Sequence, residues 1–145
     1  MLFRSPKIAL FPGSFNPFHA GHLNILKKAE QTFDKIIIAV GQNTKKSNTK
    51  QGFKLPRDLS SYEIIHYSGL LTDCIRSVHY PVTVIRGLRN TQDFEFENMQ
   101  LRYLQDTMPE VNIVYFIPDR EFLHISSSGI RSLQSIKKHQ RYLLP

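Results

Sequence analysis

The stretch Phe11-Pro-Gly-Ser-Phe-Asn-Pro-Phe-His-Ala-Gly-His22 decides the fold of this chain, and it begins where the apolar run Ile8-Ala-Leu-Phe11 ends. A short apolar run, a bend rich in proline, glycine and asparagine, and an amphipathic pattern from Gly21 onward predict a strand, a tight loop and a helix. These elements begin a parallel α/β domain, in which ligands bind just beyond the carboxyl ends of the strands.

The same stretch carries the groups of an anion site. Gly13 permits close backbone approach, and Ser14 offers a hydroxyl. His19 and His22 lie where the helix begins, with its free N–H groups and the positive end of its dipole. His22 shares a helical face with Leu26, so we expect it to point toward the sheet. The alternative is structural: one histidine caps the helix and the other is a core side chain with satisfied hydrogen bonds.

Length and composition limit the classes of protein to consider. The chain has 145 residues and a single cysteine, Cys74. We expect one domain over residues 1–145, and an inert buried thiol at Cys74. The apolar runs are far shorter than the ~20 residues of a membrane span, and the N-terminus lacks a secretory pattern. We therefore expect a cytoplasmic protein that makes no membrane contact.

The net charge of +7 is concentrated in two segments that contain no acid. The first, from Gly41 to Arg57, includes Lys45 and Lys46, and the second runs from Arg131 to the end. Such segments favour a phosphate-rich ligand or nucleic acid, although a solvated surface is an alternative, which we favour for the C-terminal segment.

Apolar runs and helical periodicities alternate along the chain. The expected strands are 7–11, 35–40, 62–67, 81–85 and 112–117, and the expected helices are 21–33, 70–78, 91–108 and one capped by Ser126, Ser127 and Ser128. Residues 41–61 are polar and broken by glycine and proline, so we expect a mobile, functional loop. The alternation predicts a Rossmann-like α/β fold, with a doubly wound, five-stranded, mainly parallel sheet and helices on both faces.

The motif Arg86-Gly-Leu-Arg89 also follows a buried strand, so it should reach the same edge of the sheet as the histidines. Guanidinium groups grip phosphate oxygens, although an ion pair with Asp93 or Glu97 is the alternative. Glu97 lies among apolar neighbours, where an acid needs a ligand or an arginine as partner. For Asp93 we expect no role beyond complementing the helix dipole.

The loop Gly13-Ser-Phe-Asn-Pro17 followed by His19-Ala-Gly-His22 resembles the phosphate-binding signature of the nucleotidyltransferase superfamily. Arg86-Gly-Leu-Arg89, Asp93-Phe-Glu-Phe-Glu97 and Ile125-Ser-Ser-Ser128 narrow the resemblance to the phosphopantetheine adenylyltransferases. The resemblance implies adenylyl transfer from ATP to 4′-phosphopantetheine, which yields dephospho-coenzyme A and pyrophosphate. It also implies a Mg²⁺ ion carried by the ATP phosphates, with no metal ligand from the protein, and a homo-oligomer, the hexamer of that family. We do not expect a nucleic-acid partner.

The resemblance implies roles for the matching positions. As catalytic residues it implies His22, Lys46, Ser14 and Arg89, with Lys45 competing for the role of Lys46. Contacts with the nucleotide are implied for Ser14, Phe15, His22, Gly87, Leu88, Arg89, Glu97, Phe122, Leu123, His124, Ile125, Ser126, Ser127 and Ser128. Contacts with the acceptor are implied for Ser14, Lys46, Leu71 and Arg86.

Two alternatives remain open at the level of sequence. Asn16, His19 and the terminal serine motif are also similar to nicotinamide mononucleotide adenylyltransferases, so the acceptor could be another phosphate ester. The protein could also be a non-catalytic relative that binds nucleotide. The segment from Ser47 to Ser61 is shorter than the phosphopantetheine adenylyltransferases usually have, which puts one wall of the acceptor pocket in question.

Overall fold

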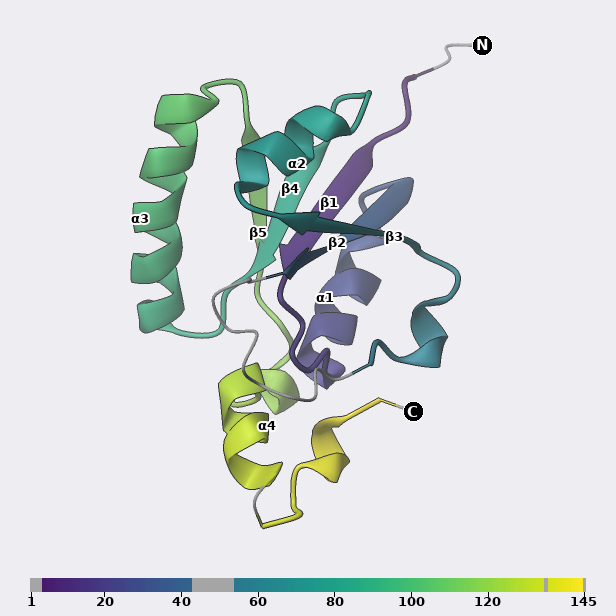
Figure 1. Cartoon of the computed structure of the whole chain (residues 1–145), viewed down its shortest axis with the longest axis vertical. Coiled ribbons are helices and arrows are strands. Elements are labelled where there is room, and N and C mark those ends of the chain that lie inside the picture. The colour runs from purple at the N-terminus through teal and green to yellow at the C-terminus, as the bar shows by residue number, and fades with distance from the viewer. Residues whose placement is uncertain (1–3, 43–53, 135, 145) are drawn as a thin grey trace.

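The structure, a computed structural model, describes residues 4–42, 54–134 and 136–144. Five parallel strands form one sheet in the order β3-β2-β1-β4-β5 (Figure 1). The strands are β1 (Ile8–Gly13), β2 (Lys35–Gln42), β3 (Glu63–Ser68), β4 (Thr83–Gly87) and β5 (Asn112–Phe116). The helices are α1 (Ala20–Ala29), α2 (Leu71–Ser77), α3 (Thr91–Thr107) and α4 (Ser127–Gln134). The predicted Rossmann-like fold is confirmed, and every strand pair is parallel.

Alternation along β2 separates the two layers of the core. Ile36 and Ile38 belong to a buried cluster with Ile25 and Leu26 of α1. The intervening Ile37 belongs to a second cluster on the opposite face of the sheet, which includes Ala39 of β2 and Cys74 of α2. Side chains of successive strand residues point to opposite faces, so the buried residues of β2, Ile36 to Ala39, are all apolar. Cys74 is buried as predicted, and burial raises the pKa of its thiol.

The strands end together, which creates the edge where the predicted motifs meet. β1 pairs with β2 from Ile8 opposite Lys35 to Gly13 opposite Val40, and β4 runs beside β1 with Thr83 opposite Ala9. α1, α3 and α4 all begin near this edge, and α4 lies beyond the ends of the strands (Figure 1). The edge therefore combines strand ends with helix N-termini.

Some element boundaries differ from the predictions. α1 ends at Ala29 instead of Phe33, because Thr32 N–H donates to the Ala29 carbonyl in a tighter turn. β4 begins at Thr83, the first of its residues paired with both neighbouring strands, and Pro81 precedes it.

The segment predicted as a polar loop also differs in its described parts. Gly41 and Gln42 extend β2, and the 3-10 helix Arg57–Leu59 inserts the fully buried Leu59 into the α1 side of the core. Residues 43–53 lie outside the described residues. Among the helices of the described ranges, none has the length and apolar character needed to cross a membrane.

Candidate active site

A cavity of about 370 Å³ opens at the carboxyl edge of the sheet. Its wall combines the loop after β1, the start of α1, the loop from β4 into α3, and the N-terminus of α4. Most of the predicted site residues line it: Ser14, Phe15, His22, Arg86, Gly87, Arg89, Glu97, Phe122, Ser126, Ser127 and Ser128. Positions separated by more than 100 residues thus meet in one place, as the strand-end argument predicts.

His19 and His22 cap the N-terminus of α1 reciprocally. The Gly21 N–H donates to His19 Nδ1 at 3.1 Å, and the His19 N–H donates to His22 Nδ1 at 3.1 Å. The two rings stack with centroids 3.7 Å apart. A Cβ at Gly21 would lie 3.0 Å from the His19 ring, so a larger residue there would have to displace the ring. Helix capping, the structural alternative, is therefore correct for His19, and both His19 and His22 also line the cavity.

These hydrogen bonds determine which nitrogen of the neutral His22 ring carries the proton. Since its Nδ1 accepts a backbone N–H, a neutral His22 carries its proton on Nε2. Burial lowers the pKa of His22 well below 6.5, and His19, Arg89 and Arg86 lower it further. Burial, followed by the charge of Arg89, lowers the pKa of His19 to about 4. At neutral pH the pair is uncharged, and His22 is a hydrogen-bond donor through Nε2.

Phe15 supports His22 from behind. Its side chain is 4% exposed, and its ring meets the His22 ring edge-on at 5.0 Å. A Cβ on Gly13 would lie 2.8 Å from the Phe15 ring. The missing side chain of Gly13 therefore makes room for Phe15, while Gly13 itself lines the cavity, so the close approach of a ligand there stays a prediction. Phe15 is nevertheless part of the cavity wall, and its contact with the nucleotide stays a prediction.

Arg86 is held by Glu97 and by the backbone of β1. Its Nη2 donates to Glu97 Oε1 at 2.6 Å, its Nε contacts both Glu97 oxygens, and its Nη1 donates to the Pro12 carbonyl at 3.2 Å. The side chain of Glu97 is 12% exposed, so the predicted need for a partner is met by an arginine. The guanidinium keeps further N–H groups on Nη1 and Nη2, which can still reach a phosphate.

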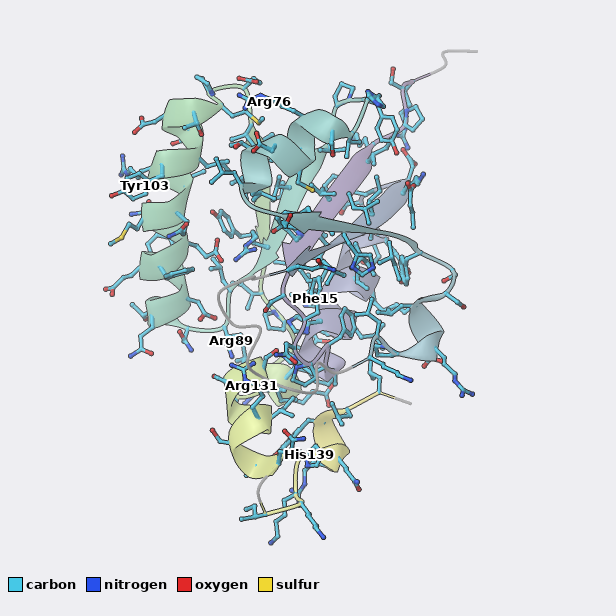
Figure 2. The ribbon with its side chains drawn as sticks, in the orientation of Figure 1. Phe15, Arg76, Arg89, Tyr103, Arg131 and His139 are labelled. Atoms are coloured by element: carbon cyan, nitrogen blue, oxygen red, sulfur yellow. The ribbon has the colours of Figure 1, made fainter. Side chains whose placement is uncertain are left out.

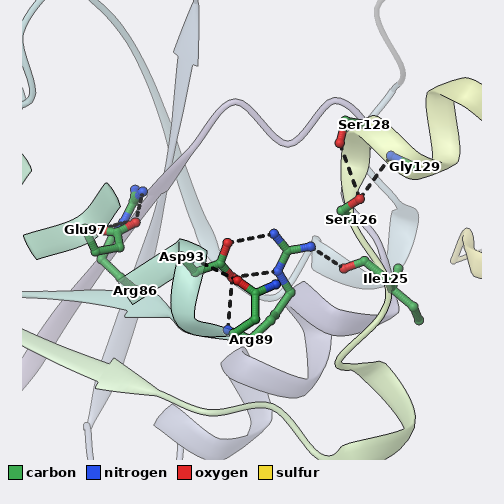
Figure 3. A network of polar contacts seen from close by, with 9 residues as sticks. Arg86, Arg89, Asp93, Glu97, Ile125, Ser126, Ser128 and Gly129 are labelled. Carbon is green, nitrogen blue, oxygen red and sulfur yellow. Dashed lines mark hydrogen bonds and ion pairs between the residues drawn. The ribbon is translucent and has the colours of Figure 1, made fainter. Parts of the chain in front are cut away.

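Arg89 forms a second, parallel arrangement (Figure 3). Its Nε and Nη2 donate to the two oxygens of Asp93, and its Nη1 donates to the Ile125 carbonyl at 2.9 Å. Burial acts to raise the pKa of Asp93, but hydrogen bonds from the side chain and backbone of Arg89 outweigh it, and the pKa is lowered. Our expectation for Asp93 was therefore wrong: besides lying in the first turn of α3, it orients Arg89. The ion pair with Asp93 was the alternative considered for the arginine motif, and the i,i+4 spacing of Arg89 and Asp93 supports it.

The serine motif has two functions in the structure. Ser126 caps α4, accepting from the Gly129 N–H at 3.0 Å, and its Oγ lies 3.4 Å from Ser128 Oγ (Figure 3). The Ser127 hydroxyl donates to the Pro17 carbonyl at 2.8 Å. Ser126 is thus the N-cap that the sequence predicted, and Ser127 connects α4 to the histidine loop.

The other predicted positions are placed as follows. Leu88 donates its N–H to the Phe116 carbonyl, and Ile125 supplies the carbonyl that holds Arg89; with Leu123 and His124 they lie outside the wall of the cavity. Lys45 and Lys46 lie outside the described residues. Residues that we did not predict also line the cavity, among them Ile25, Phe96, Pro118 and the Arg89 partner Asp93.

A second cavity, of about 380 Å³, adjoins the first. Its wall is mostly apolar and comes from α2, α3 and the strands β4 and β5, including Leu71, Leu101, Leu104 and Ile113. Arg86, Phe96 and Glu97 line both cavities. A ligand with an anionic head and a long, weakly polar arm could place the head at Arg86 and the arm in the second cavity.

The described side chains of the first cavity balance in charge. The two guanidinium groups face two carboxylates, and both histidines are neutral. Such a wall offers many N–H donors without strong net attraction for anions, so positive charge for a polyphosphate has to come from elsewhere.

Comparison with known proteins agrees with this architecture. The family model described as cytidylyltransferase-like matches residues 10–133. A solved structure from Vibrio parahaemolyticus, assigned as a nicotinate-nucleotide adenylyltransferase, superposes with a TM-score of 0.60 at 17% identity, covering 97% of this chain and 95% of that one. A Francisella tularensis bifunctional NMN adenylyltransferase/ADP ribose pyrophosphatase superposes with a TM-score of 0.58 at 16% identity, covering 96% of this chain and 44% of that one. The class defined by fold and site is that of the nucleotidyltransferases.

Closer relatives narrow the family. The phosphopantetheine adenylyltransferase of Mycoplasma capricolum is 41% identical over 139 residues, covering 91% of this chain and 99% of the relative. That of Dictyoglomus thermophilum is 31% identical over 147 residues, covering 94% of this chain and 87% of the relative. The chain belongs to the phosphopantetheine adenylyltransferase family.

Proposed function

We propose that this protein transfers the adenylyl group of ATP to 4′-phosphopantetheine, releasing pyrophosphate and forming dephospho-coenzyme A. The observation that carries the proposal is the pair of adjoining cavities that share Arg86 and Glu97. ATP fits the cavity lined by N–H donors, with its phosphates near His22 and the N-terminus of α4. The acceptor phosphate fits at Arg86, with the pantetheine arm along Leu71 in the apolar cavity.

The shape of the acceptor separates the candidate substrates. Nicotinamide mononucleotide has no long arm, and its binding would leave the apolar cavity beside Leu101 and Leu104 unfilled. 4′-Phosphopantetheine would bury its arm there, and each buried methylene contributes about 0.8 kcal/mol. The second cavity therefore favours the pantetheine ester.

The reaction needs no covalent intermediate and no general base. An oxygen of the acceptor phosphate, already ionised, attacks the α-phosphorus of ATP; the new P–O bond forms as the bond to the bridging oxygen of the β-phosphate breaks, and pyrophosphate leaves with that oxygen. His22 would donate a hydrogen bond from its Nε2–H to the phosphate oxygens on which negative charge develops. Its low pKa suits this role, because a neutral donor needs no change of protonation during turnover.

Because the described side chains of the cavity have no net charge, the positive charge that the reaction needs is expected to come from Lys46. Two anionic reactants must come together in a cavity whose two arginines are already paired with carboxylates. We infer that Lys46, or its neighbour Lys45, supplies the missing positive charge. Mg²⁺ bound to the ATP phosphates would neutralise further charge on the transferring group.

Pyrophosphate release measured with ATP and each acceptor in turn tests the proposal. We expect turnover with 4′-phosphopantetheine and a kcat/KM for nicotinamide mononucleotide lower by about 10²-fold or more, since about 1.4 kcal/mol of lost binding corresponds to tenfold. Equal turnover with both acceptors would contradict the assigned acceptor. Tight nucleotide binding without pyrophosphate release from either would favour a non-catalytic relative.

A further inference from the structure

Contacts from the C-terminal part of the chain converge on the loop between β1 and α1. Ser127 Oγ donates to the Pro17 carbonyl at 2.8 Å, and Arg131 Nη1 donates to the Asn16 carbonyl at 2.5 Å. Leu143 forms an isolated antiparallel bridge with His19. Each contact joins residues more than 100 positions apart, and all three reach the backbone just before or at the first histidine.

The C-terminal segment is itself anchored by side-chain packing. Leu144 packs against the buried cluster that contains Phe15 and Phe18. The Tyr142 ring meets the His124 ring edge-on at 5.9 Å, which connects the tail to the segment preceding α4. The tail is therefore anchored at two places, on the core cluster and on the segment that precedes α4.

We propose that residues 127–134 and 136–144, the C-terminal brace, hold the loop that carries His19 and His22 in its active arrangement, with Arg131 as a positioning residue. Arg131 lies on α4, which lies beyond the carboxyl ends of the strands (Figure 2). Its guanidinium is bound to a backbone carbonyl of the loop, which gives this member of the basic C-terminal segment a structural partner. The effect of the C-terminal brace on kcat rests on the proposed adenylyl transfer, whereas its effect on the two histidines does not.

The brace acts through the hydrogen bond between the His19 N–H and His22 Nδ1. That bond fixes both the ring orientation of His22 and the position of its proton. A shift of the backbone at Asn16 or His19 would lengthen it, release the Nε2–H form of His22 and admit water to a buried ring. A misplacement of about 1 Å in a catalytic group can cost on the order of 10²-fold in rate.

The test compares Arg131→Ala with Arg131→Lys and with a matched control, Lys138→Ala, which removes the same charge from an exposed position of the tail. A deletion of residues 143–145 removes the bridge to His19 and the packing of Leu144. Two-dimensional ¹H–¹⁵N NMR of the imidazole rings, recorded without substrates, reports the tautomer and titration midpoint of His22. Steady-state kinetics with ATP and 4′-phosphopantetheine report kcat and KM.

We expect Arg131→Ala and the deletion to mix the His22 tautomers, raise its titration midpoint by about one pH unit or more, and lower kcat by about tenfold with little change in KM for ATP. Arg131→Lys should recover part of each effect, and Lys138→Ala should match the unmodified protein. Unchanged tautomer and titration in a folded Arg131→Ala protein would overturn the proposal. So would a rise in KM for ATP at constant kcat, which would make Arg131 a phosphate ligand.

Two controls keep these outcomes interpretable. Should the deletion fail to fold, Arg131→Ala decides alone, because that side chain is exposed and its loss opens no core cavity. Should the unmodified protein release no pyrophosphate, the adenylyl-transfer proposal fails, while the NMR comparison still tests the brace.

Discussion

His19 and His22 form a stacked pair in which each Nδ1 accepts a backbone N–H at the start of α1. The arrangement leaves Nε2 of His22 as its donor, and burial lowers the pKa of both histidines so that the rings are neutral at physiological pH. The backbone N–H groups of His19 and Gly21 are thereby hydrogen-bonded within the protein, and the donor that remains for a ligand is the imidazole N–H of His22.

Replacement of His22 tests the role of that donor. His22→Ala should lower kcat by about 10²- to 10³-fold, the typical cost of losing one donor to a transition state. His22→Gln, whose amide can place an N–H near the position of Nε2, should retain more activity than His22→Ala. The exposed His66→Ala on β3 is the matched control, and thermal melting confirms folding. Normal turnover by His22→Ala would remove the residue from the mechanism.

The depressed histidine pKa values predict how stability depends on pH. Below pH 6.5 the unfolded chain binds protons at these histidines while the folded chain does not, so the folded state loses stability as the pH falls toward 4. Each such group contributes a slope of up to about 1.4 kcal/mol per pH unit. His19→Asn keeps a good helix cap and removes one titrating group, so urea denaturation between pH 7 and 4 should show a shallower loss. Identical slopes in the two proteins would contradict the assigned pKa of His19.

Substitutions of Arg86 and Arg89 should affect the KM values of different substrates. Arg89→Lys replaces the three nitrogens that bind both Asp93 oxygens and the Ile125 carbonyl with a single ammonium, which loses the planar two-nitrogen contact with Asp93. We expect KM for ATP to rise by about tenfold or more with KM for the acceptor nearly unchanged. Arg86→Lys should do the reverse, because Arg86 lies where the two cavities meet. Initial rates with each substrate varied in turn give both constants. Equal effects on both KM values would mean that the two arginines serve one site.

Lys46→Ala tests the source of the missing positive charge. With the described cavity wall balanced in charge, loss of the required lysine should lower kcat by about 10²-fold or more. Lys45→Ala is the natural comparison, because it removes the same charge one residue away. The lysine whose loss slows turnover is the one that acts, and full activity in both variants would place the charge elsewhere.

Gly13→Ala should destabilise the fold by about 1–3 kcal/mol, because the added Cβ would lie 2.8 Å from the Phe15 ring. In the double variant with Phe15→Leu, the cost should be less than the sum of the two single changes. Urea denaturation of the four proteins measures the coupling. Additive costs would show that the ring does not constrain residue 13.

The order of elements and the main motifs were readable from local sequence. The centre of β2, from Ile36 to Val40, is an uninterrupted apolar run because the sheet is covered on both faces. The helices carry apolar residues at helical spacing, so both kinds of element can be recognised from the sequence alone. Parallel strands end at a common edge, which is why the histidine loop, Arg86 and Ser126 could be expected to meet there.

Which groups pair inside that edge was decided only by tertiary structure. Glu97 was expected to find an arginine or a ligand, but the choice of Arg86 depends on the distance between β4 and α3. The contacts of Gly13 and Arg131 could not be predicted from the sequence either. Gly13 leaves space for the Phe15 ring, and Arg131 donates to the carbonyl of Asn16, 115 positions away. Local patterns record burial and backbone preference, whereas contacts between distant side chains depend on the packed geometry that brings them within hydrogen-bonding distance.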